Sequence, residues 1–175
     1  MPREPQTQGE LYARASADYG AALGRLARSY EIDPDKQRDL LQEIHLALWR
    51  SLGGFEGTCS LRTWVYRVAH NVAASHVVRQ RRHRPQRLAG LEEIETTLVD
   101  PKAEAGIGRQ HALHRLYALI RRLKPLERQI ILLYLEGSDA ASIAEITGVS
   151  SGNVATRVHR IKRILAERYQ TGSTT

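Results

Sequence analysis

The segment from Asp139 to Tyr169 constrains the fold most, because its pattern describes two helices joined by a tight turn. Asp139 is a residue type that caps helix N-termini, and Gly148 is the type that ends helices in a left-handed conformation. Ser150 can cap the second helix, whose apolar residues recur every three or four positions: Val154, Val158, Ile161 and Leu165. This spacing indicates one buried stripe opposite a polar and then basic face. The segment is therefore typical of a helix-turn-helix that lays its second helix in the major groove of DNA.

Charge points to an anionic partner. The 175 residues include 26 Lys and Arg against 19 Asp and Glu, for a net charge of +7, which suits nucleic acid or an anionic membrane surface. No apolar run approaches the roughly 20 residues of a membrane span, and the N-terminus lacks the apolar core of a signal peptide. We therefore expect a cytoplasmic protein without membrane insertion. The single cysteine, Cys59, excludes an internal disulfide and a multi-cysteine zinc site.

Helical periodicity recurs along the chain, and no segment alternates with period two, so the sequence predicts an all-α protein. After a loose tail over residues 1–9, we expect helices at 10–30, 34–52, 61–82, 109–124 and 125–136, followed by the helix-turn-helix. Asp33 followed by Pro34, and Ser60, are the expected caps of the second and third helices. Leu113 and Tyr134 are expected on inner faces.

The composition changes sign between residues 86 and 108, where acidic side chains outnumber basic ones and Pro101 and glycines interrupt any long helix. We interpret this stretch as an acidic linker that lets the two halves of the chain move independently. The sequence thus predicts two small helical domains, at 10–85 and 109–170, joined by a flexible linker, with the helix-turn-helix in the second.

A dense basic cluster ends the third expected helix: Arg79, Arg81, Arg82, Arg84 and Arg87. Local carboxylates are too few to balance it. It is either a solvated basic tail or a surface that lies against phosphates, and a net-basic chain with a helix-turn-helix favours the phosphates.

Four segments, at residues 39–55, 60–82, 123–137 and 143–162, carry a family pattern in this order along the chain. Together they resemble the sigma factors of bacterial RNA polymerase, specifically the extracytoplasmic-function (ECF) group. Residues 39–55 (DLLQEIHLALWRSLGGF) resemble the segment that grips the polymerase, and residues 60–82 (SLRTWVYRVAHNVAASHVVRQRR) resemble the promoter-melting helix. Residues 123–137 (LKPLERQIILLYLEG) and 143–162 (IAEITGVSSGNVATRVHRIK) resemble the domain that reads the upstream promoter box. A helix-turn-helix alone is shared by many regulators, so the order of the segments is the specific signal.

The resemblance implies roles for individual residues. The implied contacts to core polymerase, through its β and β′ subunits, are Asp39, Gln42, Glu43 and Arg50. The residues implied in recognising and melting the downstream box are Phe55, Cys59, Ser60, Thr63, Trp64, Tyr66, Asn71, Arg79, Arg81 and Arg82. On the recognition helix, Ser151, Asn153, Thr156, His159 and Arg160 are expected near base edges, and Arg157, Lys162 and Arg163 near phosphates.

Some of these positions have a second interpretation or depart from the family pattern. Trp64 fits a core position better than a stacking platform, because apolar residues surround it. His45 stands where the family commonly has Phe, Ala155 where it often has Lys or Arg, and Ser142 where a capping-box Glu is common. These departures bear on local packing, sequence preference and helix stability.

The sequence also suggests a further partner for this chain and has to be weighed against two rival functions. The resemblance implies an anti-sigma factor as a regulator, beside promoter DNA and polymerase. The rival function is a stand-alone regulator that binds operator DNA as a dimer, which accounts only for the second half of the chain. An enzyme is disfavoured, because His111 and His114 lack the spacing of a metal-binding helix motif, so we expect no catalytic residue, metal site or cofactor.

Overall fold

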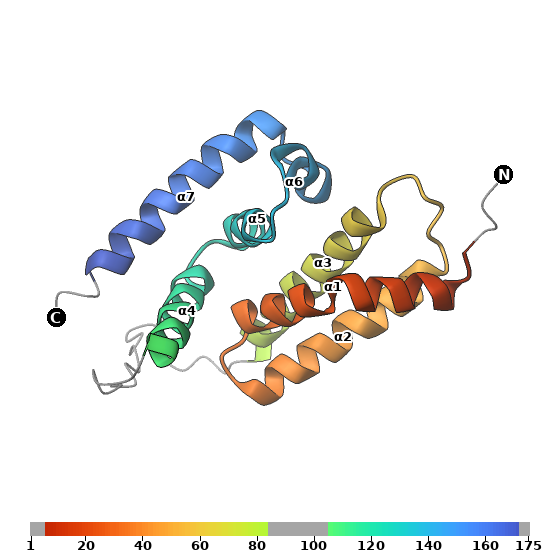
Figure 1. Ribbon diagram of the computed structural model, residues 1–175, viewed down its shortest axis with the longest axis horizontal. Helices are drawn as coiled ribbons and strands as arrows, with labels where there is room; N and C mark the ends of the chain where they lie inside the picture. The colour runs from red at the N-terminus through yellow and green to blue at the C-terminus, as the bar shows by residue number, and fades with distance from the viewer. Residues whose placement is uncertain (1–5, 84–104, 172–175) are drawn as a thin grey trace.

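The computed structural model describes residues 6–83 and 105–171, without the side chains of 81–83, 105–107 and 171. Within these ranges the chain forms α-helices and no strand, which confirms the all-α prediction (Figure 1). The helices are α1 (Gln8–Tyr30), α2 (Pro34–Leu52), α3 (Leu61–His83), α4 (Ala105–Arg121), α5 (Pro125–Leu135), α6 (Ala140–Thr147) and α7 (Ser151–Thr171).

The first half of the chain is a three-helix unit in which α1, α2 and α3 all contact one another. Thr7 begins α1 with a capping box, since its side chain accepts from the backbone of Glu10 while the Glu10 carboxylate accepts from the backbone of Thr7. Asp33 caps α2 as predicted, with its side chain accepting from the Asp35 backbone at 2.8 Å. The apolar stripes of the three helices meet in a core that is fully buried at Leu23, Leu40, Ile44, Leu48 and Val65.

The second half packs α5, α6 and α7 against one another, and α4 contacts α7. Asp139 caps α6 through a 2.7 Å hydrogen bond from the Ser142 backbone, and Gly148 ends it at a φ of 75°, in the left-handed region that only glycine adopts readily. The predicted stripe of α7 is buried: Val154, Val158, Ile161 and Leu165. The helix-turn-helix therefore forms as its sequence predicts.

Three details differ from the sequence prediction. Helix α4 begins at Ala105, ahead of the predicted start at Arg109, so the end of the predicted linker is helical. Leu113 is 45 % exposed and Tyr134 is 41 % exposed, so neither lies on a buried face. Tyr134 instead lies beneath the ammonium group of Lys162, 5.4 Å from the ring centre. Residues 8–9 of the predicted tail at 1–9 belong to α1, because the capping box at Thr7 begins the helix there. Residues 1–5, linker residues 86–104, Arg84 and Arg87 lie outside the described residues, and the domain boundaries stay predictions.

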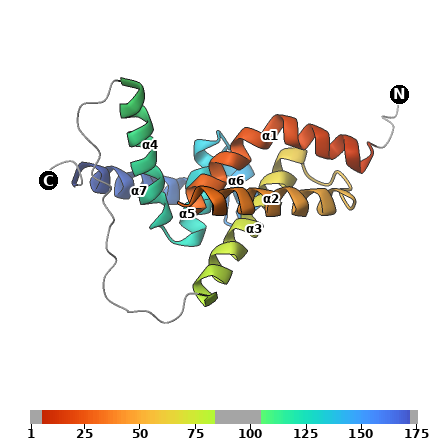
Figure 2. The ribbon, with the colours of Figure 1, turned by 90° about the horizontal axis from the view of Figure 1, so that it is seen from below.

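The two halves are in contact, although the sequence predicts that they move independently. Helix α1 meets α4, and α3 meets α6 (Figure 2). Near the end of α1, Arg121 Nη1 of α4 donates to the carbonyl oxygen of Arg28 at 3.0 Å, and the Arg128 guanidinium of α5 lies 4.9 Å from the centre of the Tyr30 ring. The contact between α3 and α6 places the helix-turn-helix beside the start of α3.

Candidate nucleic-acid interface

The loop before α3 is held by a small hydrogen-bond network. Ser60 caps the helix as predicted, accepting from the Thr63 backbone at 3.0 Å, and its hydroxyl donates to Thr63 Oγ1 at 2.9 Å. Trp64 Nε1 donates to Ser51 Oγ at 3.0 Å, and the Trp64 ring meets Phe55 edge-on with centroids 5.3 Å apart. The packing therefore favours a structural position for Trp64 over an open stacking platform, and it fixes the loop against the end of α2.

The other predicted melting residues differ in accessibility. Ser60 and Asn71 are exposed, Phe55 and Cys59 are half-buried, and Thr63 and Tyr66 are buried. Arg79 is exposed and forms an ion pair with Glu43 of α2, a residue predicted to bind polymerase. Arg81 and Arg82 lie on α3, but their side chains are outside the described residues. The structure thus gathers the predicted set on one helix and its preceding loop, with Thr63 and Tyr66 covered.

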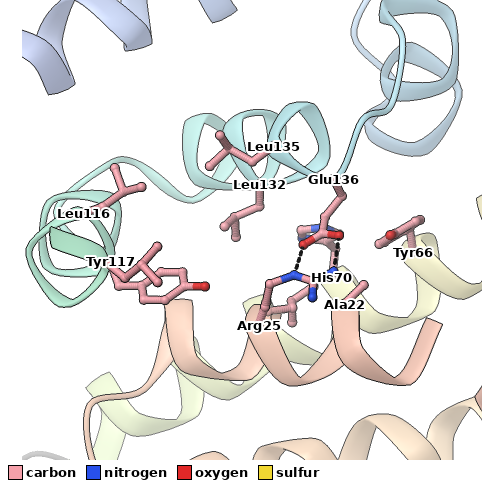
Figure 3. A pocket seen from close by; sticks show the side chains of 11 residues that line it. Ala22, Arg25, Tyr66, His70, Leu116, Tyr117, Leu132, Leu135 and Glu136 are labelled. Carbon is pink, nitrogen blue, oxygen red and sulfur yellow. Dashed lines mark hydrogen bonds and ion pairs between the residues drawn. The ribbon is translucent and has the colours of Figure 1, made fainter. Parts of the chain in front are cut away.

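A cavity of about 280 Å³ lies between the two halves, beside Tyr66 (Figure 3). An ion pair forms part of its wall, with the Arg25 guanidinium of α1 bound to both carboxylate oxygens of Glu136 at 2.6 and 2.7 Å. Burial and the nearby Glu136 carboxylate raise the pKa of Tyr66 above its ordinary value. Apolar side chains of both halves form the rest of the lining.

His70 also lines this cavity and is the most strongly perturbed titratable group beside it. Its ring is 2 % exposed, and its Nδ1 atom has no hydrogen-bond partner among the described residues. Burial lowers the pKa of His70 from 6.5 to about 3, because a charged imidazolium loses its hydration there. His70 is therefore neutral at physiological pH, and the sequence offers no signal for its burial.

The predicted polymerase-binding residues lie on the outer side of α2. Asp39, Gln42 and Arg50 are exposed, while Glu43 is partly covered by its ion pair. Two apolar residues of the same helix are also exposed, Leu46 at 49 % and Trp49 at 44 %. The sequence analysis did not single them out, although their four-residue and seven-residue spacing from Gln42 places them on its face of the helix.

His45, which stands where the family commonly has Phe, packs against α1. Its Nδ1 atom lies 3.0 Å from the Tyr12 hydroxyl, and the rings of Tyr12 and Trp49 meet edge-on with centroids 5.4 Å apart. Burial lowers the pKa of His45 below its ordinary value. An uncharged imidazole can thus stand in for an apolar ring at this position.

The recognition candidates of α7 lie opposite its buried stripe. Ser151, Asn153, Thr156 and His159 are exposed, and Arg157 is half-buried. The basic residues are positioned by neighbours: Arg160 forms an ion pair with Glu127 of α5, Arg163 lies 3.6 Å from Glu167, and Lys162 lies over Tyr134. The N-terminal turns of α7 therefore present polar side chains, and basic side chains follow further along the helix.

Comparison with known proteins links both halves to one family. Residues 17–83 match the family described as Sigma-70 region 2, and residues 113–165 match Sigma-70, region 4. The ECF RNA polymerase sigma-E factor of Haemophilus influenzae is 30 % identical over 139 residues, covering 75 % of this chain and 74 % of that protein. The RNA polymerase sigma factor NccH of Alcaligenes xylosoxydans xylosoxydans is 28 % identical over 167 residues, covering 93 % and 90 %.

Two solved structures share the fold. CnrH in complex with the cytosolic domain of CnrY aligns with a TM-score of 0.65 at 21 % identity, covering 91 % of this chain and 88 % of that one. The sigma factor RpoE in complex with the anti-sigma factor NepR from Bartonella quintana aligns with a TM-score of 0.67 at 20 % identity, covering 91 % and 96 %.

A three-helix unit followed by a helix-turn-helix unit, each matching its own region, defines a sigma-70-type transcription initiation factor. Within that class, the chain belongs to the ECF RNA polymerase sigma factors. Across residues 6–83 and 105–171, we find no helix with the length and apolar character that a bilayer crossing requires. The same ranges contain no group of three or more His, Cys, Asp or Glu side chains placed to hold a metal ion.

Proposed function

We propose that this chain binds core RNA polymerase through the outer face of α2, opens the downstream promoter box with the loop before α3 and with α3 itself, and reads the upstream box with α7. The observation that carries the proposal is the family match of both halves in the order region 2, region 4. Opening DNA without a chemical energy source requires a surface that captures unpaired bases and holds the strands. Asn71 is exposed on α3 and can offer both a donor and an acceptor to a base edge.

We further propose that an anti-sigma factor controls this chain in the cytoplasm, and that the chain has no catalytic activity of its own. The support is the pair of similar structures, each of which holds a sigma factor with a partner: CnrH with the cytosolic domain of CnrY, and RpoE with the anti-sigma factor NepR. A partner that covers α2 or the α3 loop would block initiation without altering the fold.

Transcription with purified core RNA polymerase and a promoter library tests the main proposal. Addition of this protein is expected to produce new transcript starts that core polymerase alone does not give, since a sigma factor supplies promoter choice and melting. The rival regulator predicts a silent polymerase and a footprint of the protein alone on a palindromic operator. That result would reject the sigma-factor function for this chain.

Arg160→Ala is expected to weaken upstream-box recognition by about 5- to 150-fold, which corresponds to the roughly 1–3 kcal/mol of one good base contact. Polymerase binding should not change, because Arg160 lies on α7 whereas the proposed polymerase contact lies on α2. Promoter competition and a polymerase pull-down measure the two quantities separately. Equal loss of both would contradict the division of roles.

The ion pair of Arg160 with Glu127 requires a matched control. Glu127→Ala removes the same ion pair while keeping the arginine, so it reports the contribution of α5–α7 packing. We expect it to retain upstream-box recognition, because a guanidinium released from the carboxylate stays available to DNA. A loss as large as that of Arg160→Ala would assign the effect to packing.

A further inference from the structure

Hydrogen-bond donors in the first two turns of α3 are occupied by oxygen atoms from the second half of the chain. Arg62 Nη2 donates to the backbone carbonyl of Glu136 at 2.7 Å and to Ser138 Oγ at 3.3 Å. Arg67 Nη2 donates to the backbone carbonyl of Glu145, in α6, at 3.0 Å. The turn between α5 and α6, together with α6, thus supplies the acceptors that these guanidinium groups bind.

Thr63, between the two arginines, is bound in the same way. Its hydroxyl donates to Glu145 Oε2 at 3.3 Å, and the residue is 4 % exposed. The bidentate ion pair of Arg25 with Glu136 closes the adjacent edge of the contact. A DNA strand cannot reach Thr63 while α6 lies there, although Thr63 belongs to the set predicted to act on the downstream box.

This contact has the features of a surface that separates, unlike a domain core. A partly open pocket of about 280 Å³ lies along it, so the two halves do not pack there as closely as the interior of a domain does. Arg62 Nε is buried without a partner among the described residues, so the acceptors from the second half satisfy this guanidinium only in part. The Arg25–Glu136 pair is partly exposed, with 45 % and 19 % of the side chains accessible, so salt and water can compete for it.

We propose that Arg62, Thr63 and Arg67 form a binding surface for single-stranded DNA, and that α6 covers this surface in the free protein. The inference rests on the proposed role of α3 in promoter opening. Carbonyl and carboxylate oxygens of the second half occupy donors that would otherwise hold phosphate oxygens and a base edge. The two halves must therefore separate before the surface can accept a strand.

The recognition helix is not covered in the same state. Ser151, Asn153 and Thr156 are exposed at the start of α7, while α6 makes the contact with α3. The closed protein can thus present its upstream-box reader while withholding its single-strand surface. Only molecules in which the halves are apart can bind single-stranded DNA. The apparent affinity is therefore the affinity of the open form multiplied by the fraction of molecules that are open.

The test uses the full-length chain and a fluorescein-labelled single-stranded DNA oligonucleotide of mixed sequence. Arg25→Glu places two carboxylates against each other at the edge of the contact and should separate the halves. We expect a larger radius of gyration by small-angle X-ray scattering and about tenfold tighter DNA binding by fluorescence anisotropy. The sign is informative, because the substitution lowers the positive charge of the protein and would otherwise weaken binding to DNA.

The matched control is the exchange variant Arg25→Glu with Glu136→Arg, which has the net charge of the original chain and can rebuild the ion pair. It should return both the radius of gyration and the DNA affinity toward the original values. Adding Arg62→Ala to Arg25→Glu should remove most of the gain. It should also flatten the dependence of log K on log salt by about 0.7, the contribution of one phosphate contact on a single strand.

Glu145→Ala provides a second route with little expected effect on stability, since it places a good helix former at an exposed position of α6 and removes the acceptor of Thr63. It should raise DNA affinity by about two- to threefold. An Arg25→Glu protein that stays compact, or one that expands without tighter DNA binding, would overturn the inference. Neither result touches the proposed function, which the transcription test of the original chain decides separately.

Discussion

Ile161→Ala is expected to unfold the helix-turn-helix selectively. Ile161 is fully buried in α7, where its side chain completes the stripe that packs on α5 and α6. Truncating such a residue typically costs about 2–5 kcal/mol, from lost burial and the cavity left behind. A unit as small as residues 109–170 has little stability in reserve, so a loss of this size is expected to leave much of it unfolded.

The two tryptophans of the chain, Trp49 and Trp64, make this prediction easy to measure, because both lie in the first half. Urea unfolding followed by tryptophan fluorescence reports α1–α3, whereas far-ultraviolet circular dichroism reports all helices. For Ile161→Ala we expect part of the dichroism to be lost at low urea while the fluorescence midpoint is retained. Upstream-box recognition should be lost with the dichroism.

Thr156→Ala is the matched control for stability, because Thr156 lies on α7 but is exposed. It should change the free energy of unfolding by no more than about 0.5 kcal/mol. If Ile161→Ala shifts the fluorescence and dichroism transitions equally, the two halves unfold as one unit, and the prediction of two domains is wrong.

Local sequence signals account for most of the fold. Asp33 and Asp139 cap helices because a carboxylate accepts the unpaired backbone N–H groups of a first turn, and Gly148 ends α6 because glycine has no Cβ to oppose a positive φ. The stripe of Val154, Val158 and Ile161 needs only helical periodicity. Such signals involve residues within a few positions of one another, so they are readable without tertiary information.

The contact between the two halves could not be predicted in this way. Arg25 and Glu136 are 111 positions apart, and Thr63 and Glu145 are 82 apart, so no local pattern links them. Each is an ordinary polar residue on its own helix, where a solvated position is the usual expectation. Thr63 and Tyr66 lie at that contact and are buried. Asn71 lies outside it and stays exposed.

His70→Phe is expected to remove a pH dependence of stability from the first half of the chain. The pKa of His70 is about 3 in the folded protein and 6.5 in an unfolded chain, so below pH 6.5 the unfolded state binds a proton that the folded state excludes. The free energy of unfolding is therefore fully retained above pH 6.5 and falls by about 1.4 kcal/mol per pH unit as the pH drops toward 3. At pH 5 the loss is about 2 kcal/mol.

Phenylalanine suits the site, because the His70 ring meets those of Tyr30 and Tyr66 at centroid distances of 6.5 Å and its Nδ1 atom lacks a partner among the described residues. Urea midpoints by tryptophan fluorescence between pH 5 and 7.5 should flatten in His70→Phe, with little change at pH 7.5. Tyr30→Phe, which keeps His70 among the same rings, should retain the original slope. Equal slopes in all three proteins would mean that the folded state accommodates the imidazolium, and that the cavity between the halves admits enough water to hydrate it.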